Sequence, residues 1–401
     1  MDFTLSKNQL HWQHTARQFA QQRVAPMARE MDESGEMPLA LVSEMAALGL
    51  LGGTIPKSLG GSEMDHVSLA LVYEELGRAC SSVRGFMTVH TSLVMQCINA
   101  WGSEEQKRTY LSPMARGEVI GCYALTEPEA GSDAASIQTT AEKREQGNYR
   151  LNGEKIWITN GNIARIAIVF AKTNSPSYEA KRNRRGLGGG QEEEQTLKPH
   201  EQITAFIVRL NNPDIERTRM PGQELGHRAS DHAKIVFRDT PVSGDLVLGG
   251  EGMGFKVAMS ALDHGRLGVA AGALGVHQAC LDACISFAKE RKQFGKRIAD
   301  FEMIQSTLAE MKASLDASRL LVYRAAWMKD QGLPTKLETS IAKYFATEAA
   351  CKAASDAVLL HGGRGYSNEY PVERYYRDIK GLQIYEGTSH IQKIVIAREL
   401  I

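Results

Sequence analysis

The pattern of hydrophobic and polar positions divides the chain into three zones. Residues 5–115 follow a helical period, with Gly-rich breaks between the predicted helices. Residues 119–247 contain short runs rich in β-branched residues, such as ARIAIVFAKT and HAKIVFRDT, which predict strands. A helical pattern rich in alanine resumes near residue 254 and continues to residue 401.

This order of helices, strands and helices predicts an α+β fold without alternating βαβ units. We expect an N-terminal helical domain over residues 1–118, a middle β-domain over residues 119–248 and a C-terminal helical domain over residues 249–401. A chain of 401 residues exceeds the usual size of one compact domain, which agrees with several units sharing a core.

Two local patterns make sharper predictions. The segment SLALVYEELGRAC places Leu69, Val72, Leu76 and Ala79 on one stripe, which predicts an amphipathic helix. In NYRLNGEKIWITNG, the Asn152-Gly153 pair separates two alternating runs, which predicts a β-hairpin turn.

Residues 174–202 break the composition of the chain. They contain almost no large apolar side chains, a basic block at 181–185, a glycine run and three glutamates at 192–194. Such a segment buries too little surface to offset the entropy lost on ordering, so we expect a mobile insertion between two strands. A second interpretation is a docking site for an acidic partner.

Composition narrows the classes of function. Hydrophobic residues make up 43% and charged residues 23% of the chain, as in an ordinary globular protein. The 47 basic and 47 acidic side chains cancel, so net charge gives no support to nucleic-acid binding. The six cysteines form no CxxC pair and no zinc-ligand spacing, so we expect no metal and a reducing compartment. Because no secretory signal or membrane-length apolar run is evident, we expect a cytoplasmic protein that does not bind membranes.

Several common catalytic signatures are absent from the sequence. The chain has no Gly-rich dinucleotide fingerprint after a strand, no P-loop, no GxSxG and no HExxH. Pyridine-nucleotide binding, P-loop hydrolysis, serine-esterase and zinc-protease functions therefore lose support.

The first of four polar motifs is CYALTEPEAGSDA. Pro128 and Gly131 predict an irregular loop after a strand. The amide and hydroxyl donors of Leu125, Thr126 and Ser132 are then not used in the hydrogen bonds of a β-sheet. Such a loop suits a polar heterocycle or a phosphate, whereas the alternative is a plain turn.

Two further motifs combine an aromatic ring with polar groups. In WITNG, Trp157 and Thr159 share one face of a strand, although a core tryptophan is the commoner case. In KERKQFGKRI, a helix carrying Arg291 and Phe294 is predicted to break at Gly295, although a solvated basic helix end explains the same residues.

The fourth motif, YEGTSHIQKIVIAREL, carries the most weight. Ser389 and Gln392 form a capping-box pattern, which predicts a C-terminal helix beginning there. Glu386 precedes this helix among apolar neighbours, so desolvation is expected to raise its pKa toward that of a useful base. The alternative is a helix-start glutamate that interacts with the dipole. Three apolar residues of the helix are expected to be buried, namely Ile391, Ile394 and Val395.

Together these motifs resemble the acyl-CoA dehydrogenase family, in the same order and over essentially the whole chain. The resemblance extends to GFKVAMSALDHGRLGVAAGALG and LHGGRGYSNEYPVERYYRDIKGLQIYEGT. It implies an N-terminal helical domain, a middle domain that is a β-barrel or sandwich, and a C-terminal four-helix bundle. It also implies FAD as cofactor and a homodimer or homotetramer, because subunits of this family share their FAD sites.

The resemblance assigns a role to each matching residue. Glu386 matches the catalytic base, whose own backbone amide and a ribityl hydroxyl of FAD bind the thioester carbonyl in this family. One branch of the family carries its base beside the arginine of ALDHGR, where this chain has Gly265. The residues implied to contact FAD are Leu125, Thr126, Ser132, Trp157, Thr159, Arg291, Phe294, Gly362, Gly363 and Thr388. The residues implied to contact substrate are Arg84, Arg266, Tyr385 and Gly387. The family often has Gln at the position of Leu359, which puts one contact to the FAD diphosphate in doubt.

Arg84 is the sharpest clue to the substrate. Its segment, CSSVRGFMTVHTSLVM, resembles glutaryl-CoA dehydrogenases, in which an arginine here pairs with the substrate carboxylate. The match is incomplete, because those enzymes carry a glutamate where this chain has Gly77. The segment equally resembles dehydrogenases of polyketide precursor pathways, which oxidise short hydroxyacyl groups on an acyl carrier protein. In a local alternative, Arg84 pairs with Glu74 or Glu75.

Several functions fit these residues. The first is FAD-dependent α,β-dehydrogenation of a short acyl-CoA, with Glu386 abstracting the α-proton and FAD accepting the β-hydride. The second is dehydrogenation of a (hydroxy)acyl group on an acyl carrier protein, as in polyketide precursor pathways, with the basic block at 181–185 as its dock. An electron-transfer flavoprotein or oxygen is the expected electron acceptor. A flavin oxidase and a non-catalytic binding protein are also known on this fold, although the presence of Glu386 speaks against the latter.

Overall fold

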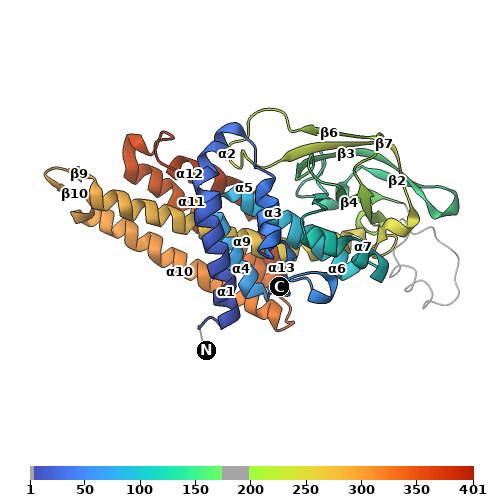
Figure 1. Cartoon of the computed structure of the whole chain (residues 1–401), viewed down its shortest axis with the longest axis horizontal. Coiled ribbons are helices and arrows are strands. Elements are labelled where there is room, and N and C mark those ends of the chain that lie inside the picture. Colours follow the sequence, from blue (N-terminus) through green and yellow to red (C-terminus); the bar gives the residue numbers. More distant parts are fainter. Residues whose placement is uncertain (1–3, 174–197) are drawn as a thin grey trace.

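The computed structural model describes residues 4–173 and 198–401 (Figure 1). The predicted insertion at 174–202, with its basic block, lies outside the described residues except for its end. That end forms a single 3₁₀ turn, η8 (Pro199–Gln202), directly before a strand.

The N-terminal region is helical, as the sequence pattern predicts. Its α-helices are α1 (Lys7–Phe19), α2 (Ala28–Ser34), α3 (Ala40–Ala47), α4 (His66–Ala79), α5 (Ser81–Thr88), α6 (Gln96–Trp101) and α7 (Glu104–Ala115). A π-helical stretch, η5 (Val89–Met95), joins α5 to α6. The expected amphipathic pattern of α4 is wrong, because its buried residues lie on all sides, Glu74 and Glu75 included. The helix is enclosed by neighbours such as α1 and helices of the C-terminal region.

Eight of the described strands form one mixed sheet, in the order β6-β7-β3-β2-β4-β5-β8, with β1 paired to β4. The strands are β1 (Gly121–Ala124), β2 (Thr140–Lys143), β3 (Tyr149–Thr159), β4 (Ile166–Lys172), β5 (Ile203–Arg209), β6 (Ile215–Arg219), β7 (His232–Val242) and β8 (Val247–Leu248). β4 pairs in parallel with β1 and β2, and the other pairs are antiparallel.

The hairpin predicted at Asn152-Gly153 is wrong, because β3 runs straight through this pair. The register between β3 and β7 shifts here, so the two residues form a β-bulge. Gly153 has φ +148°, and a Cβ on it would lie 2.5 Å from Thr139 Oγ1. The side chain of Asn152 accepts a 2.8 Å hydrogen bond from the Asp239 N–H across the bulge. The Asn-Gly signal is therefore used for a close approach between strands rather than for a turn.

The C-terminal region is a set of packed helices. Its helices are α9 (Gly254–Glu290), α10 (Glu302–Asp330), α11 (Lys336–His361), α12 (Val372–Leu382) and α13 (Ser389–Leu400). A small hairpin of β9 (Lys292–Gln293) and β10 (Lys296–Arg297) joins α9 to α10 and projects at the end opposite the sheet (Figure 1). α9 is long and apolar enough to cross a membrane, but 78% of that apolar stretch is buried inside the protein. It is the central helix of the core.

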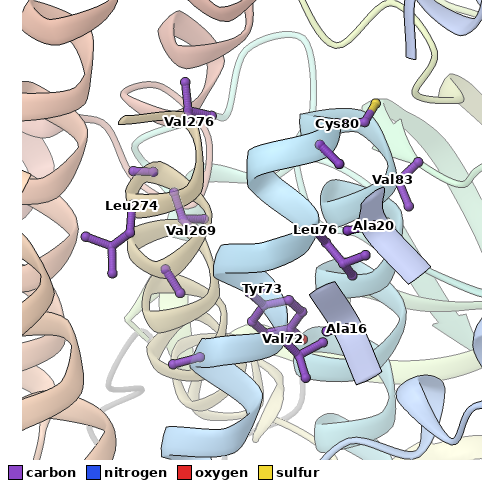
Figure 2. Close-up of a cluster of buried hydrophobic side chains, with 14 of the residues drawn as sticks. Ala16, Ala20, Val72, Tyr73, Leu76, Cys80, Val83, Val269, Leu274 and Val276 are labelled. Carbon is purple, nitrogen blue, oxygen red and sulfur yellow. The ribbon is translucent and has the colours of Figure 1, made fainter. Parts of the chain in front are cut away.

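Close packing of α4 on α9 joins the N- and C-terminal regions (Figure 2). Leu76, Val269 and Leu274 belong to the largest cluster of buried apolar side chains. Gly77 faces Gly272 across this contact, and a Cβ on Gly77 would lie 2.6 Å from the Gly272 carbonyl oxygen. The absence of a side chain at position 77 therefore sets how closely the two helices approach.

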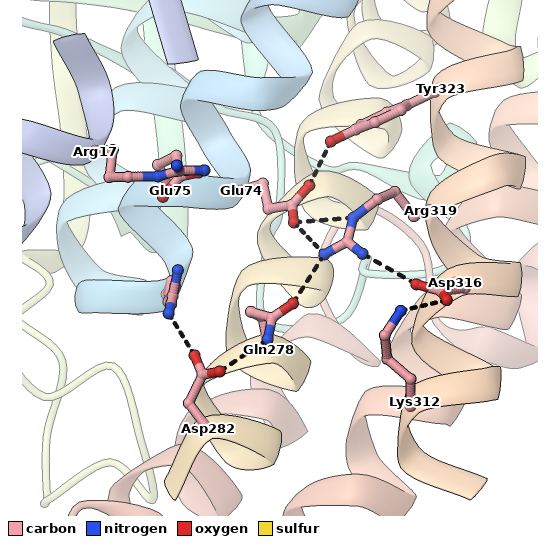
Figure 3. Close-up of polar contacts among 10 residues, drawn as sticks. Arg17, Glu74, Glu75, Gln278, Asp282, Lys312, Asp316, Arg319 and Tyr323 are labelled. Atoms are coloured by element: carbon pink, nitrogen blue, oxygen red, sulfur yellow. Dashed lines mark hydrogen bonds and ion pairs between the residues drawn. The ribbon is translucent and has the colours of Figure 1, made fainter. Parts of the chain in front are cut away.

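A polar network covers the edge of the same helix contact (Figure 3). The Glu74 carboxylate accepts hydrogen bonds from Arg319 at 2.6 Å and from the Tyr323 hydroxyl at 2.7 Å. Glu75 accepts one from Arg17 at 2.7 Å. Both carboxylates are buried, and each is compensated by an arginine from a different helix.

The network predicts that Arg319→Met destabilises the protein. The change leaves the buried Glu74 carboxylate without its cation, which costs about 3 to 5 kcal/mol of unfolding free energy. Urea unfolding at fixed protein concentration measures the effect. Arg238→Met is the control, because Arg238 pairs with Glu216 at the surface and its loss is expected to cost under about 1 kcal/mol. Equal unfolding midpoints for the two variants would contradict the prediction.

Candidate functional site

A cavity of about 600 Å³ lies where the helical regions meet the sheet. Its walls come from α5, η5, the loop after β1, the end of β3, the loop before β7, α9, α13 and the segment that leads into α13. The predicted site residues that line it are Arg84, Leu125, Thr126, Ser132, Trp157, Thr159, Arg266, Tyr385, Glu386 and Gly387. Segments as far apart as residues 84 and 387 therefore contribute to one cavity.

Glu386 lies in a backbone turn of unusual conformation. Its φ is +56°, a left-handed value that is costly for a residue with a side chain, and Gly387 follows at +90°. The Lys343 ammonium of α11 donates to the carbonyl oxygens of Tyr385, at 2.7 Å, and of Gly387. The Gln392 side chain donates to the Gly387 carbonyl oxygen at 2.8 Å and to that of Glu386 at 3.3 Å. The strained turn is thus held from two helices.

The last helix begins at Ser389 as predicted, but the capping box expected from Ser389 and Gln392 is wrong. Thr388 is the N-cap, and its hydroxyl accepts a hydrogen bond from the Ile391 N–H. Ser389 instead donates to Glu348, and Gln392 is used to hold the Glu386 turn.

The Glu386 carboxylate sits against α9. A Cβ on Gly265 would overlap its Oε2 atom, so the glycine creates the space that the carboxylate occupies. Oε2 is buried and has no hydrogen-bond partner among the described residues. Burial raises the pKa of Glu386 to about 7, while the charges of Lys343, Arg84 and Arg266 act to lower it. The result is a carboxylate poised to exchange a proton near neutral pH.

Arg84 is buried in the cavity wall without an acidic partner. It is 1% exposed, and no carboxylate lies within ion-pair range in the described part of the chain. Its guanidinium donates to the Tyr385 hydroxyl and, at 3.5 Å, to Thr88, while Nε is unpaired. The alternative in which Glu74 or Glu75 compensates Arg84 is wrong, because α4 directs both glutamates to other arginines.

Tyr385 links Arg84 to the β-region. Its ring packs edge-on against His227, with centroids 5.6 Å apart. The His227 N–H donates to Asp378 of α12 at 2.7 Å, which attaches the loop before β7 to the C-terminal helices. Burial lowers the pKa of His227 well below its usual range, so this ring is neutral.

The loop after β1 presents hydroxyl groups to the cavity. Those of Thr126, Ser132 and Thr159 have no hydrogen-bond partner within residues 4–173 and 198–401. Behind this loop, Lys155 is fully buried and donates to the Leu125 carbonyl oxygen at 3.0 Å and to Glu127 at 2.7 Å. Burial lowers the pKa of Lys155 to about 8. This buried ion pair fixes the loop against β3.

Trp157 is placed by a second bulge in β3. Its φ is +57°, and the register with β7 shifts between Lys155 and Ile158. The indole is 50% exposed and lines the cavity near Thr159, so the core-tryptophan alternative is wrong. After the strand, Asn160 adopts φ +68° and its N–H donates to the Asp231 carbonyl oxygen at 2.7 Å.

Other predicted cofactor residues lie away from the cavity. α9 ends at Glu290, so Arg291 and Phe294 are on the β9–β10 hairpin rather than on a helix. Phe294 and Gly295 both have positive φ, which allows a two-residue hairpin turn, and the Phe294 side chain is 94% exposed. At the end of α11, Gly362 and Gly363 are exposed and nothing stands within 4 Å of a Cβ placed on either. Leu359, one turn earlier, is also exposed.

The expected burial of three residues of α13 is wrong. Ile391 and Val395 are half-buried and Ile394 is exposed, and all three line the cavity. The helix has an apolar face because it forms a cavity wall. Its buried residue among those described is the polar Gln392, which serves the Glu386 turn.

Family models match the three regions of the chain in turn. They describe the acyl-CoA dehydrogenase N-terminal domain at residues 6–118, the middle domain at 122–240 and the C-terminal domain at 252–401. The probable acyl-CoA dehydrogenase YngJ of Bacillus subtilis is 41% identical over the whole of both chains. The mitochondrial short-chain specific acyl-CoA dehydrogenase of Homo sapiens is 40% identical, covering 96% of this chain and 88% of its own length.

Solved structures agree with these sequence relatives. Butyryl-CoA dehydrogenase from Megasphaera elsdenii superposes with a TM-score of 0.91 at 38% identity over all of both chains. A glutaryl-coenzyme A dehydrogenase in complex with glutaryl-CoA also reaches 0.91, at 34% identity, over 100% of this chain and 96% of that one. The prolyl acyl carrier protein oxidase AnaB reaches 0.89 at 30% identity, over 99% and 100%. The resemblance and the three-domain fold expected from the sequence are confirmed, and the chain belongs to the acyl-CoA dehydrogenase family.

Proposed function

We propose that this chain is an FAD-dependent dehydrogenase that oxidises the α,β bond of a short acyl thioester. The observation that carries the proposal is the Glu386 carboxylate, buried in the cavity wall with a pKa near neutrality and one oxygen without a partner. A base that removes a proton from carbon needs both a free lone pair and a raised pKa, and Glu386 has both.

The cavity suits a flavin. Three hydroxyls without partners, those of Thr126, Ser132 and Thr159, supply polar contacts for a ring system rich in nitrogen and oxygen. Trp157 offers a half-exposed aromatic face, and Leu125 supplies apolar contact. FAD, when bound, supplies the hydride acceptor for the β-carbon.

Glu386 supplies the proton-transfer step. Its carboxylate removes the α-proton of the thioester, so negative charge develops on the carbonyl oxygen. The Glu386 N–H has no acceptor among the described residues, so it is available to stabilise that oxygen. Tyr385 and Gly387 flank the base in the cavity wall and complete the substrate contact.

Arg84 selects for a polar acyl end. Burial of a cation without a carboxylate partner is costly, and an anionic or hydroxylated acyl group would relieve that cost. The glutamate that accompanies this arginine in glutaryl-CoA dehydrogenases is missing. This chain has Gly77 at that position, and Gly77 packs on Gly272 with no room for a larger side chain. Arg266 is less available, since it pairs with Asp263 at 2.8 Å.

A carrier-bound (hydroxy)acyl group is the second candidate substrate. The likeness to the prolyl acyl carrier protein oxidase AnaB supports it, as does the buried Arg84 in the cavity wall. An electron-transfer flavoprotein is the proposed acceptor, with oxygen as the alternative.

We propose that the outlying residues act between subunits. Arg291 and Phe294 on the exposed hairpin, with Gly362 and Gly363 at the end of α11, are exposed and far from the cavity lining, as contacts to a neighbouring subunit's FAD require. Thr388, the N-cap beside Gly387, completes the proposed contacts to the cofactor's diphosphate side. A homodimer or homotetramer follows from this arrangement.

Glu386→Gln tests the base. Anaerobic bleaching of the bound flavin by butyryl-CoA is expected to slow by about 10²- to 10⁴-fold, because the amide cannot accept the α-proton. The FAD content of the purified variant is the control, and it should match that of the wild type. Bleaching at the wild-type rate would exclude Glu386 as the base.

The pKa of Glu386 predicts the pH dependence. Because the deprotonated carboxylate is active, kcat/KM for butyryl-CoA should fall about tenfold per pH unit below about 7 and level off above it. Steady-state assays with an artificial electron acceptor between about pH 5.5 and 8.5 measure this limb. A flat profile over that interval would contradict the assignment.

Arg84→Ala tests the substrate. If Arg84 pairs with a carboxylate, the variant should lose about 10- to 100-fold in kcat/KM for glutaryl-CoA, the worth of a charged hydrogen bond, while butyryl-CoA changes little. The same acyl groups on an acyl carrier protein are assayed in parallel. Bleaching by the carrier-bound forms alone would assign the enzyme to carrier-protein substrates, and equal losses for both acyl groups would remove the specificity role of Arg84.

A further inference from the structure

Lys343 is a buried amine directed at the backbone around Glu386. Burial lowers the pKa of Lys343 to about 7, while the Glu386 charge acts to raise it, so the amine carries its charge below that pH. It lies on α11 with 1% of its surface exposed, and no carboxylate is within ion-pair range of it in the described part of the chain. Its ammonium bridges the carbonyl oxygens of Tyr385 and Gly387, the two residues on either side of the base. Among the described residues, the other side chain of α11 near this turn is Glu348, which accepts a hydrogen bond from Ser389, two residues beyond Gly387.

Two costs fall at the same place in the chain. The left-handed backbone of Glu386 costs about 1 to 3 kcal/mol, and burial of an ammonium that forms no contact ion pair costs several more. Helix packing alone does not require a lysine here, since the buried neighbours on α11, Ala342 and Ala346, are small and apolar. The position of the lysine therefore points to a role at the turn.

We propose that Lys343 is a positioning residue for Glu386. It clamps the left-handed turn so that the carboxylate points into the space left by Gly265, and its positive charge favours the carboxylate over the carboxylic acid. This inference rests on the proposed function, in which Glu386 is the base.

Charge supports the same assignment. Burial is the largest influence on the pKa of Glu386 and raises it, and the Lys343 charge is the largest influence that lowers it. Arg84 and Arg266 act in the same direction more weakly, and they are engaged by Tyr385 and Asp263 respectively. Six titratable groups face Glu386 from the elements packed around it. They are Lys343 of α11, Arg84 of α5, Arg266 of α9, Tyr73 of α4, Tyr123 of β1 and the adjacent Tyr385.

Among these groups, Lys343 is the one that binds the backbone on both sides of the base.

The test separates charge from hydrogen bonding with two substitutions in the FAD-loaded enzyme. Lys343→Gln keeps N–H donors for the two carbonyls but removes the charge, whereas Lys343→Met removes both. The inflection in the pH profile of kcat/KM for butyryl-CoA should move upward by about one pH unit or more in both variants, with activity at pH 7 lower by about fivefold or more. At high pH, Lys343→Gln should recover most of the activity and Lys343→Met should not.

Two further variants provide matched controls. Gln392→Leu removes the other side-chain donor to the turn without changing charge, so it should lower kcat at every pH and leave the inflection in place. Lys352→Met, on the exposed side of α11, should leave both the rate and the inflection unchanged.

A second readout does not depend on turnover. The carboxyl infrared band of Glu386, assigned by its loss in Glu386→Gln, is titrated in each variant and should shift in parallel with the kinetic inflection. If the wild type is active and the inflection and the band of Lys343→Gln both stay at the wild-type pH, the proposal is overturned. If the wild type itself does not bleach its flavin with any acyl thioester, the proposed function fails, while the infrared titration still decides whether Lys343 controls the Glu386 proton.

Discussion

Desolvation of the Glu386 carboxylate is the constraint on which the arrangement of the cavity depends. Three cations come from three separate helices, Arg84 from α5, Arg266 from α9 and Lys343 from α11, yet none forms a contact ion pair with the carboxylate. A direct pair would lower the pKa too far for a base that must regain its proton. Cations held at a distance favour the ionised form without neutralising it, because each is engaged by a different group.

Much of the fold could be predicted because its signals are local. Long helices at both ends and strand-length runs between them follow from the period of apolar positions. The failures have tertiary causes. Asn152-Gly153 is a bulge rather than a turn because Thr139 approaches Gly153 from a neighbouring segment, and α4 is buried on all sides because helices distant in sequence enclose it. No local pattern carries that information.

Part of the cavity lining could be predicted from short motifs, since Thr126, Trp157 and Glu386 each stand in a distinctive polar context. The supporting residues could not. Lys343 lies in an Ala-rich helix, 42 residues before the Tyr385 carbonyl it binds, and its sequence context is that of an ordinary surface lysine. The sequence around Lys155, within a strand, is likewise that of an ordinary surface lysine. In both cases burial is decided by distant segments, as it is for the glutamates of α4 that turn away from Arg84.

The central helix has a mechanical consequence. α9 carries Gly265 beside the carboxylate, crosses α4 at Gly272, and continues without interruption to Glu290 and the exposed hairpin. About 18 residues separate the crossing from the far end, which is roughly 27 Å of stiff rod. A side chain at position 77 that tilted this rod by about 5° would swing the hairpin through roughly 2 to 3 Å. The tilt of α9 is therefore set where Gly77 meets Gly272. A larger residue at this crossing would move the exposed hairpin and change the surface that it presents to another molecule.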